Sequence, residues 1–419
     1  MRKKLSSEVV EQYRVVQRKI DAQKAAGVSN EQFLRTSNVR VVVDPDIEKY
    51  FDQVVDLLNS ASDVDYTKQR LATEKDIETL RKDLGEFGFH AGCVFAKDNH
   101  GDYGFVGFYL LHHIAKVKRL VHFTFSCRAM HMGIEQYVYE LLGRPEIKIA
   151  DPVSYGLQTH EKIDWINQEG GASGSGVASN QNLVLLGGCD LLQLSSYCSV
   201  NRQEFVSKVK DGVKIRYDDP GFILNDRETI KASAALRKIP FWTYEDAASF
   251  DAAVKAADII ILSLWPAARG DYFRTHDQLL LHINKQTQKQ IKDYKPGWLK
   301  RQVVDLDYKL PERLKLIAES LDKVGEVCSP EARIFVLGFH TFDNVEGDLL
   351  KQRTAYNEAC RDYCANRGSK FVFVDVNKIV PQETLIDQAH FTRLGYFALA
   401  KFIMQAVSNP EKSAALHAA

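Results

Sequence analysis

The segment Leu385–Tyr396, LIDQAHFTRLGY, carries the most explicit chemical pattern in the chain. Asp387 and His390 stand three residues apart in it, just before a helix expected to begin near Gly395. A carboxylate at this spacing can accept a hydrogen bond from imidazole Nδ1, which fixes the tautomer and leaves Nε2 available as a general base. The alternative is a histidine that caps or packs against the last helix, because so short a pattern also arises by chance.

A base of this kind needs a nucleophile, and the best candidate is Cys189 in the stretch Leu186–Leu192, LGGCDLL. Two glycines permit a sharp turn from an apolar strand into a helix that begins near the cysteine. Backbone N–H groups and the helix dipole favour the thiolate at such a position, and the thiolate is the nucleophilic form. The same turn, with Gly188 and Asp190, could also bind an oxyanion or the substrate. The alternative is a small buried cysteine that packs below the start of the helix.

Two further candidates follow expected strands in the same half of the chain. Trp265 comes directly after Asp258–Leu264, and His340 comes directly after Arg333–Phe339. Ligands of parallel sheets bind at the carboxyl ends of the strands, so both residues are candidates for substrate binding. Arg269 lies on the same polar loop as Trp265. For His340, the alternative is a loop residue whose hydrogen bonds are satisfied.

The elements that must position these residues alternate between strands and helices over residues 183–419. Expected strands are Leu183–Leu186, Val213–Tyr217, Asp258–Leu264, Arg333–Phe339 and Lys370–Val376. Expected helices are Leu191–Asp211, Arg227–Arg237, His276–Tyr294, Pro311–Val327, Asp348–Arg367 and Gly395–Val407. This alternation predicts an α/β domain with a parallel sheet that is covered on both faces. The glycine turn and the D-x-x-H segment both follow strands of that sheet, so the two can converge.

The first part of the chain has a different order. Residues 1–37 predict two helices, and residues 38–166 predict a compact α+β domain. Its order is one strand, two helices, three strands and a helix. The strands are expected at Asn38–Val43, His90–Lys97, Tyr103–His112 and Arg119–Ser126, and the later two helices at Thr73–Glu86 and Met132–Leu142. Residues 167–182, NQEGGASGSGVASNQN, predict a flexible linker because glycine, serine and asparagine dominate them.

The composition excludes several classes of function. Lys plus Arg and Asp plus Glu number 55 each, so no basic excess indicates binding to nucleic acid. No run of about 18 apolar residues predicts a membrane span, and the basic N-terminus lacks the apolar run of a signal peptide. Seven scattered cysteines argue against a disulfide scaffold, and Cys360 and Cys364 are expected to pack rather than bind a metal. We therefore expect a cytoplasmic protein without a metal or a tightly bound cofactor.

The second domain resembles the SGNH/GDSL hydrolase superfamily, which places its nucleophile after the first strand and a D-x-x-H before the last helix. The positions that match the final motif are Asp387, His390, Gly395, Tyr396, Leu399 and Ala400. The resemblance implies a flavodoxin-like three-layer α/β/α fold. The family has serine in a G-D-S turn, whereas this turn reads G-G-C-D, so Cys189 resembles the cysteine versions among SGNH-like polysaccharide acetyltransferases. The family's other oxyanion donors are a loop glycine and an asparagine. No asparagine follows Asp258–Leu264, where the chain reads Trp265-Pro266-Ala267, so Gly221 and Asn344 are the expected substitutes for these donors.

The first domain resembles acyl-CoA N-acyltransferase (GNAT) folds in its element order. It also resembles the GNAT-like C-terminal region of FkbH-type proteins over roughly residues 8–145. The segments that carry this resemblance are Gly101–Gly107, Phe125–Arg128 and Gly133–Glu135. GNAT folds hold the cofactor pyrophosphate on backbone N–H groups at a helix start, so the resemblance implies an acyl-CoA or carrier-protein site.

The residues that match this second resemblance are Asp102, Arg128 and Gly133, which are candidates for acyl-CoA or carrier binding. The chain departs from the family where His131 replaces the first of two glycines, because a side chain there obstructs the close approach of a pyrophosphate. The closing half of the sheet is also expected to be short. For Asp102 and Arg128 the alternative is a structural role in a turn and at a strand end.

Three functions from different classes stay open. The first is acyl transfer, in which Cys189 attacks an acyl donor, His390 moves the proton and Asp387 orients His390. The resemblances imply acyl-CoA or an acyl-carrier protein as donor, and a small-molecule or glycan hydroxyl or amine as acceptor, in polysaccharide or natural-product biosynthesis. The second is hydrolysis by the same residues, as in an esterase or deacylase. The third is a non-catalytic scaffold that docks carrier proteins.

Overall fold

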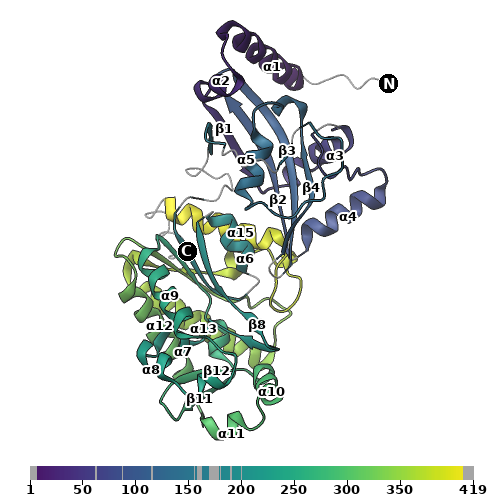
Figure 1. The fold of residues 1–419 in the computed structure, drawn as a ribbon. Coiled ribbons are helices and arrows are strands. Elements are labelled where there is room, and N and C mark those ends of the chain that lie inside the picture. The colour runs from purple at the N-terminus through teal and green to yellow at the C-terminus, as the bar shows by residue number, and fades with distance from the viewer. Residues whose placement is uncertain are drawn as a thin grey trace. The chain divides into compact units, whose positions relative to one another are not determined.

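The computed structural model of the chain describes residues 7–61, 64–86, 88–114, 117–154, 156–157, 163–168, 179, 181–188, 191–199 and 201–408. The chain divides into two compact units, residues 1–178 and 179–419, and each unit contains both helices and strands (Figure 1). The predicted mixed α/β class is therefore confirmed. Most of the predicted linker lies outside the described residues, and Asn167 and Gln168 at its start belong to a strand.

The first unit is built on a five-stranded sheet with the order β4-β3-β2-β1-β5. Its strands are β1 (Val39–Asp44), β2 (Phe89–Asp98), β3 (Gly101–Ile114), β4 (Val117–Phe125) and β5 (Ile166–Gln168). The first four pair antiparallel, and β5 pairs parallel with β1. Its helices are α1 (Ser7–Ala26), α2 (Asn30–Thr36), α3 (Phe51–Ser60), α4 (Glu74–Gly85) and α5 (Ile134–Leu141). The predicted order of strand, two helices, three strands and helix is confirmed for β1 to α5.

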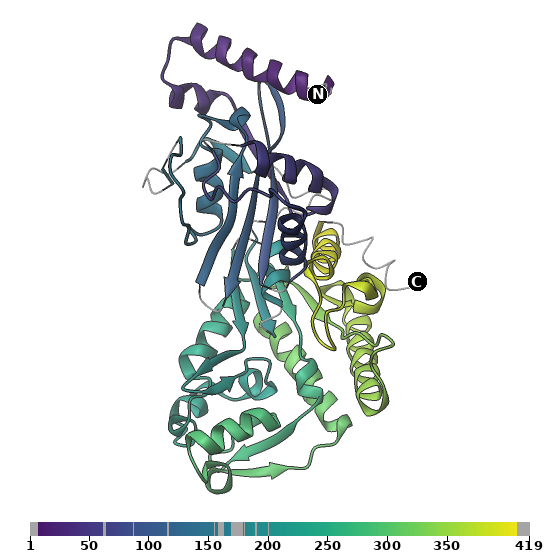
Figure 2. The same cartoon turned by 90° about the vertical axis from the view of Figure 1, so that its right-hand side faces the viewer.

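Both faces of this sheet are covered by helices (Figure 2). On one face, α3 and α4 pack on apolar residues of β2 and β3, including Phe105 and Phe108. On the other face, α5 packs on Phe123 and Phe125 of β4. Helix α4 begins with a capping box, because the Thr73 hydroxyl accepts from the Asp76 N–H and the Asp76 carboxylate accepts from the Thr73 N–H.

The second unit is built on a five-stranded parallel sheet with the order β15-β14-β10-β6-β7. Its strands are β6 (Leu183–Gly187), β7 (Arg202–Val206), β10 (Ile259–Leu262), β14 (Arg333–Leu337) and β15 (Phe371–Val374). In chain order this arrangement is 2-1-3-4-5, so the first strand, β6, lies between the second and the third. The connections leave β6 and β10 toward opposite sides, and a crevice opens at the carboxyl ends of these two strands.

Alternate residues of these strands point to opposite faces and build two cores. Leu183 and Leu185 of β6 face α6 (Leu192–Cys198) and α15 (Arg393–Ser408). Val184 and Leu186 face the other side. The helices on that side are α9 (Tyr244–Ala256), α12 (Leu310–Val327) and α13 (Gly347–Ala365). Three layers result, with helices on both faces of the parallel sheet (Figure 1).

Two predicted elements of the second unit are wrong. The helix expected over residues 191–211 ends at Cys198, and the edge strand β7 and the short β8 (Lys208–Lys210) follow. In β7 only Phe205 is buried, while Gln203 and Glu204 are exposed, so the strand has no repeating apolar pattern. Its arginine, glutamine and glutamate favour a helix when the neighbouring strand is not known. The helix expected from His276 begins only at α10 (Lys285–Tyr294), because residues 280–283 form a strand.

The smaller elements of the second unit surround the sheet. A two-stranded ribbon joins β8 with β9 (Val213–Ile215), and a three-stranded sheet has the order β12-β11-β13. The remaining helices and strands are α7 (Pro220–Leu224), α8 (Arg227–Ala232), β11 (Asp271–Thr275), β12 (Leu280–Ile283), α11 (Trp298–Gln302), β13 (Val303–Leu306) and α14 (Val376–Ile379). Cys360 and Cys364 of α13 are buried in the core, where burial raises the pKa of the Cys360 thiol to about 12. In the part of the chain that the structure describes, no helix has the length and apolar character needed to cross a membrane.

One buried tyrosine ties two strands together at the edge where the crevice opens. The Tyr356 hydroxyl of α13 donates to the Leu337 carbonyl at 3.0 Å and accepts from the Leu264 N–H at 3.3 Å. These backbone groups lie at the carboxyl ends of β14 and just beyond β10, and Tyr356 is fully buried. The hydroxyl therefore satisfies two backbone groups that water does not reach.

We expect Tyr356→Phe to lower the free energy of unfolding by about 1–3 kcal/mol, because it leaves a buried carbonyl and a buried N–H unsatisfied. Urea denaturation measures this difference. The matched control is Tyr294→Phe, since Tyr294 is 44% exposed and its hydroxyl needs no protein partner. Equal stability of both variants and the parent protein would contradict the bridging role.

Candidate active site

A cavity of about 550 Å³ opens at the carboxyl edge of the parallel sheet in the second unit. Its wall includes residues that follow three neighbouring strands: Gly188 after β6, Ser263 and Trp265 after β10, and Gly338 and His340 after β14. The cavity therefore occupies the crevice that the strand order predicts, between strands whose connections diverge.

The Asp387–His390 contact is present in the structure. His390 Nδ1 lies 2.8 Å and 2.9 Å from the two carboxylate oxygens of Asp387. The backbone N–H groups of Ala389 and His390 donate to the same carboxylate at 2.7 Å and 2.9 Å. Burial alone would raise the pKa of Asp387, but the His390 side chain and these two N–H groups together lower it. The carboxylate thus stays ionised and orients the imidazole, and His390 lines the cavity.

A buried arginine supports the loop that carries this pair. Arg353 of α13 is 2% exposed, and its guanidinium donates to the Gln388 carbonyl at 2.6 Å and to the His340 carbonyl at 3.0 Å. The same guanidinium lies over the rings of Phe339, at 4.4 Å, and Trp265, at 5.6 Å. Arg353 therefore links the ends of β10 and β14 to the D-x-x-H loop.

His340, like Arg353, supports the loop that carries Asp387 and His390. It is 1% exposed, and its Nε2–H donates to the Gln388 carbonyl at 2.8 Å. Burial, and then the neighbouring Arg353 charge, lowers the pKa of His340 to about 4. The ring is thus neutral near pH 7 and acts as a fixed donor. The hydrogen bond of this ring agrees with the alternative of a satisfied loop residue, and His340 also lines the cavity, so the substrate contact stays a prediction.

The two substitutes expected for the oxyanion asparagine lie elsewhere. Gly221 sits in α7, its N–H donates to Asp219 at 2.7 Å, and an added Cβ would lie 2.0 Å from the Leu280 carbonyl oxygen. Gly221 is therefore required for packing against β12. Asn344 is exposed in the loop before α13. Neither is among the described residues that line the cavity, so both assignments are corrected.

Cys189 and Asp190, the predicted nucleophile and its neighbour, lie outside the described residues. Gly188, which directly precedes Cys189 in the sequence, lines the cavity together with His390. Trp265 also lines it and is 6% exposed. Of the predicted second-domain residues, Gly188, Trp265, His340 and His390 thus come to one cavity.

Several cavity residues were missed in the sequence. Ser263 is the only polar side chain between Ile259 and Leu264, and this isolated polar position at a strand end is a signal that could have identified it. Lys214 and Arg216 alternate on the expected strand Val213–Tyr217, so they share one face. His282 and Lys285 come from a region that was predicted to be one helix, which concealed them.

Two buried groups hold the loop at the rim of the cavity. Asp219 accepts from the Gly221 and His282 N–H groups and from Trp242 Nε1, at 2.7, 3.2 and 3.3 Å. Burial raises the pKa of Asp219 to about 7. The His282 Nε2–H donates to the Arg269 carbonyl, and burial lowers the pKa of His282 to about 4. The charged forms are disfavoured at both sites because water is excluded.

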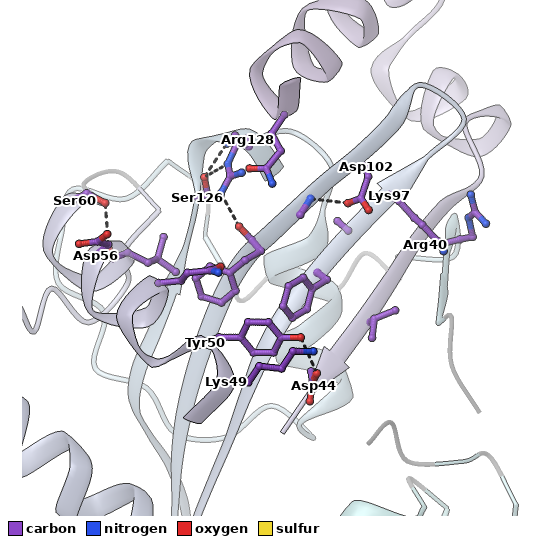
Figure 3. Close-up of a pocket in the computed structure, with 18 residues that line it drawn as sticks. Arg40, Asp44, Lys49, Tyr50, Asp56, Ser60, Lys97, Asp102, Ser126 and Arg128 are labelled. Carbon is purple, nitrogen blue, oxygen red and sulfur yellow. Dashed lines mark hydrogen bonds between the residues drawn. The ribbon is translucent and has the colours of Figure 1, made fainter. Parts of the chain in front are cut away.

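The first unit contains a separate cleft of about 820 Å³, and Asp102 and Arg128 line it (Figure 3). Both side chains hold strand β3. Asp102 accepts from the Gly104 N–H at 2.7 Å, and the Arg128 guanidinium donates to the Tyr103 and Phe105 carbonyls at 3.1 Å and 2.6 Å. The structure thus shows the structural role that was the alternative for this pair.

Gly133 does not line this cleft with Asp102 and Arg128. It precedes α5 with φ +76°, where an added Cβ would lie 3.1 Å from the Trp165 ring. Trp165 Nε1 donates to the Met132 carbonyl at 3.0 Å, so the indole covers the start of α5. His131 adopts φ +66°, a conformation that favours glycine. The predicted grouping of the three residues is therefore wrong, because the chain's own side chains fill the space beside the helix start.

We expect Arg353→Met to loosen the D-x-x-H loop, because it removes charge-assisted hydrogen bonds to two carbonyls. Loss of about 1.5–3 kcal/mol corresponds to roughly 10–100-fold faster hydrogen exchange at the Ala389 and His390 amides. The control is Arg301→Met, since Arg301 also donates to a carbonyl, that of Pro296, but on the surface. Unchanged exchange in Arg353→Met would show that the loop is held without the guanidinium.

Acid should destabilise the second unit partly through His340. The pKa of His340 is depressed in the folded state, so its contribution to stability is present above pH 6.5 and is lost as the pH falls toward 4. His282 acts in the same direction, whereas the raised pKa of Asp219 acts in the opposite direction over about the same range.

We therefore expect His340→Gln to flatten the pH dependence of the unfolding free energy by about 1.4 kcal/mol per pH unit between pH 4 and 6.5. Urea denaturation at a series of pH values measures the slope, which separates titration from any uniform loss of stability. The matched control is His276→Gln, at an exposed position. A slope identical to that of the parent protein would contradict a neutral buried His340.

Comparison of the chain with protein-family models, with curated proteins and with solved structures gave no match. The resemblances read from the two sets of motifs therefore stay predictions. Any chemistry proposed for the second-unit cavity rests on its own residues, above all on His390, which Asp387 orients and which lines the cavity with Gly188.

Proposed function

We propose that the second unit catalyses acyl transfer through a thioester on Cys189, with His390 as general acid–base and Asp387 as its positioning carboxylate. One observation supports this proposal most directly. The Asp387 carboxylate holds His390 Nδ1 at 2.8–2.9 Å, while His390 and Gly188 line the same cavity. The ring nitrogen that remains, Nε2, is the one a general base would use, and the residue after Gly188 is a cysteine.

The reaction would run in two halves. Cys189 Sγ attacks the acyl carbonyl of the donor while His390 takes the thiol proton, and the donor's leaving group departs with that proton. The acceptor hydroxyl or amine then attacks the thioester carbonyl while His390 takes its proton, and the sulfur leaves and is reprotonated. Asp387 stabilises the imidazolium in both halves. Acyl-CoA or an acyl-carrier protein fits as donor, because each transfers an acyl group from sulfur.

Negative charge develops on the carbonyl oxygen in each half and needs donors. The N–H group of Gly188, which lines the cavity, is one candidate. The Ser263 hydroxyl is a second, because Ser263 is 8% exposed and lines the cavity just after β10. Ser263 follows β10, and the SGNH family has its oxyanion asparagine after the corresponding strand. The parallel 2-1-3-4-5 strand order is also the one that this resemblance implies.

The test is the intact mass of the protein after incubation with acetyl-CoA and with an acetylated carrier protein. We expect one acetyl adduct, none in Cys189→Ala, and acylation that is about 10²–10⁴-fold slower in His390→Ala. Cys127→Ala is the matched control, because Cys127 is an exposed free cysteine of the first unit and should leave the adduct unchanged.

The other outcomes separate the competing functions. Release of free acid without an acceptor would assign hydrolysis to the same residues. Absence of an adduct and of product with every donor would overturn the enzymatic proposal and favour a docking scaffold. An adduct that survives in Cys189→Ala would place the nucleophile elsewhere.

A further inference from the structure

The wall of the second-unit cavity is strongly cationic. Four basic side chains line it: Lys214, Arg216, Arg269 and Lys285. None of the described residues that line the cavity is an aspartate or a glutamate. The cleft of the first unit differs, because there Arg40, Lys49 and Lys97 alternate with Asp44 and Asp56 (Figure 3).

Two of the four cations have carboxylate partners. Arg216 pairs with Asp218, which is fully buried, with Nε and Oδ1 2.9 Å apart. Lys285 pairs with Asp271 at 2.5 Å. Burial tends to raise the pKa of Asp271, but hydrogen bonds from Lys285 and Gln288 lower it overall, so this carboxylate is ionised. These two cations are therefore neutralised within the protein.

The other two, Lys214 and Arg269, form no ion pair with any described residue. Arg269 lies over the Trp265 ring at 5.8 Å, on the same indole that Arg353 contacts. Burial, and then repulsion from Arg269, lowers the pKa of Arg353 to about 10. Arg269 and Arg353 thus place two like charges beside the same indole, and an anion bound to Arg269 would reduce their repulsion.

We infer that the substrate of this cavity carries a phosphate group, which Lys214 and Arg269 bind. Two cations without carboxylate partners match the two charges of a phosphate monoester better than the single charge of a carboxylate. Arginine binds phosphate oxygens through its planar fork, and lysine adds a point charge. The inference rests on the proposed function only in that the bound molecule is one of the reactants. The phosphate can belong to the donor, as in coenzyme A, or to a phosphorylated sugar acceptor.

The experiment is a calorimetric titration of the full chain at low ionic strength with four probes. Coenzyme A is compared with pantetheine, and glucose 1-phosphate with glucose, so each phosphate compound has a neutral counterpart. We expect at least one phosphate compound to bind about tenfold or more tightly than its counterpart, with affinity that falls as salt is added. If coenzyme A alone binds more tightly than its counterpart, the phosphate belongs to the donor. If glucose 1-phosphate alone does so, the phosphate belongs to the acceptor.

Arg269→Gln and Lys214→Gln should each weaken this binding about tenfold or more, because each removes a charge-assisted hydrogen bond to the phosphate. Lys300→Gln is the matched control on the exposed surface of α11 and should bind like the parent protein. Equal binding of phosphate and neutral probes, or phosphate binding unchanged in both cavity variants, would overturn the inference.

The outcomes distinguish a failure of the phosphate inference from a failure of the proposed function. Phosphate binding that depends on Arg269, without any acylation of Cys189, would leave the anion site standing and remove the catalytic proposal. The opposite result is also possible to recognise. If pantetheine and coenzyme A thioesters acylate Cys189 at equal rates, and the two sugar probes bind equally, the catalytic proposal stands and the phosphate inference is wrong.

Discussion

A buried guanidinium with no carboxylate among its described contacts organises the candidate site. Arg353 donates to the carbonyls of Gln388 and His340, and its guanidinium lies over two aromatic rings. A buried charge is costly unless its hydrogen bonds are made, so the carbonyls must stay where the guanidinium needs them. Because Gln388 lies between Asp387 and His390, fixing its carbonyl also restricts where these two side chains can lie.

The sheet supplies the second constraint. Parallel strands end at one edge, and the order 2-1-3-4-5 separates the connections that follow β6 and β10. Gly188, after β6, and Ser263, after β10, line the crevice between these strands. The Tyr356 hydroxyl bonds to backbone groups at the end of β14 and just beyond β10, and so links these two strands at this edge. Side chains from distant parts of the unit, such as Ser263 and His390, therefore line one cavity.

The cleft of the first unit and the cavity of the second unit differ in the contacts that their polar groups make. In the first unit, Asp102 and Arg128 form hydrogen bonds with backbone groups of strand β3, and Trp165 covers the start of α5. In the second unit, Lys214 and Arg269 face a cavity without a carboxylate partner among the described residues. Groups that are already satisfied stabilise a fold, whereas unbalanced charge at a cavity wall favours a ligand of opposite sign.

Local pattern was enough to predict much of this protein. The apolar runs at Ile259–Leu262 and Phe371–Val374 are strands because each is buried on both faces, and the Asp387–His390 contact follows from a spacing of three residues. The edge strand β7 was missed because Phe205 is the one buried residue among its five, and its arginine, glutamine and glutamate also favour helices.

Only the tertiary structure decided which distant residues join the site. Arg353 lies 35 positions before Gln388, and Lys214 reaches the cavity from a ribbon outside the main sheet. Periodicity within an element shows which of its faces is buried, but it cannot show which loop that face will meet. The sequence therefore determined the strands and the oriented histidine, while long-range packing decided what supports the histidine and what charge surrounds it.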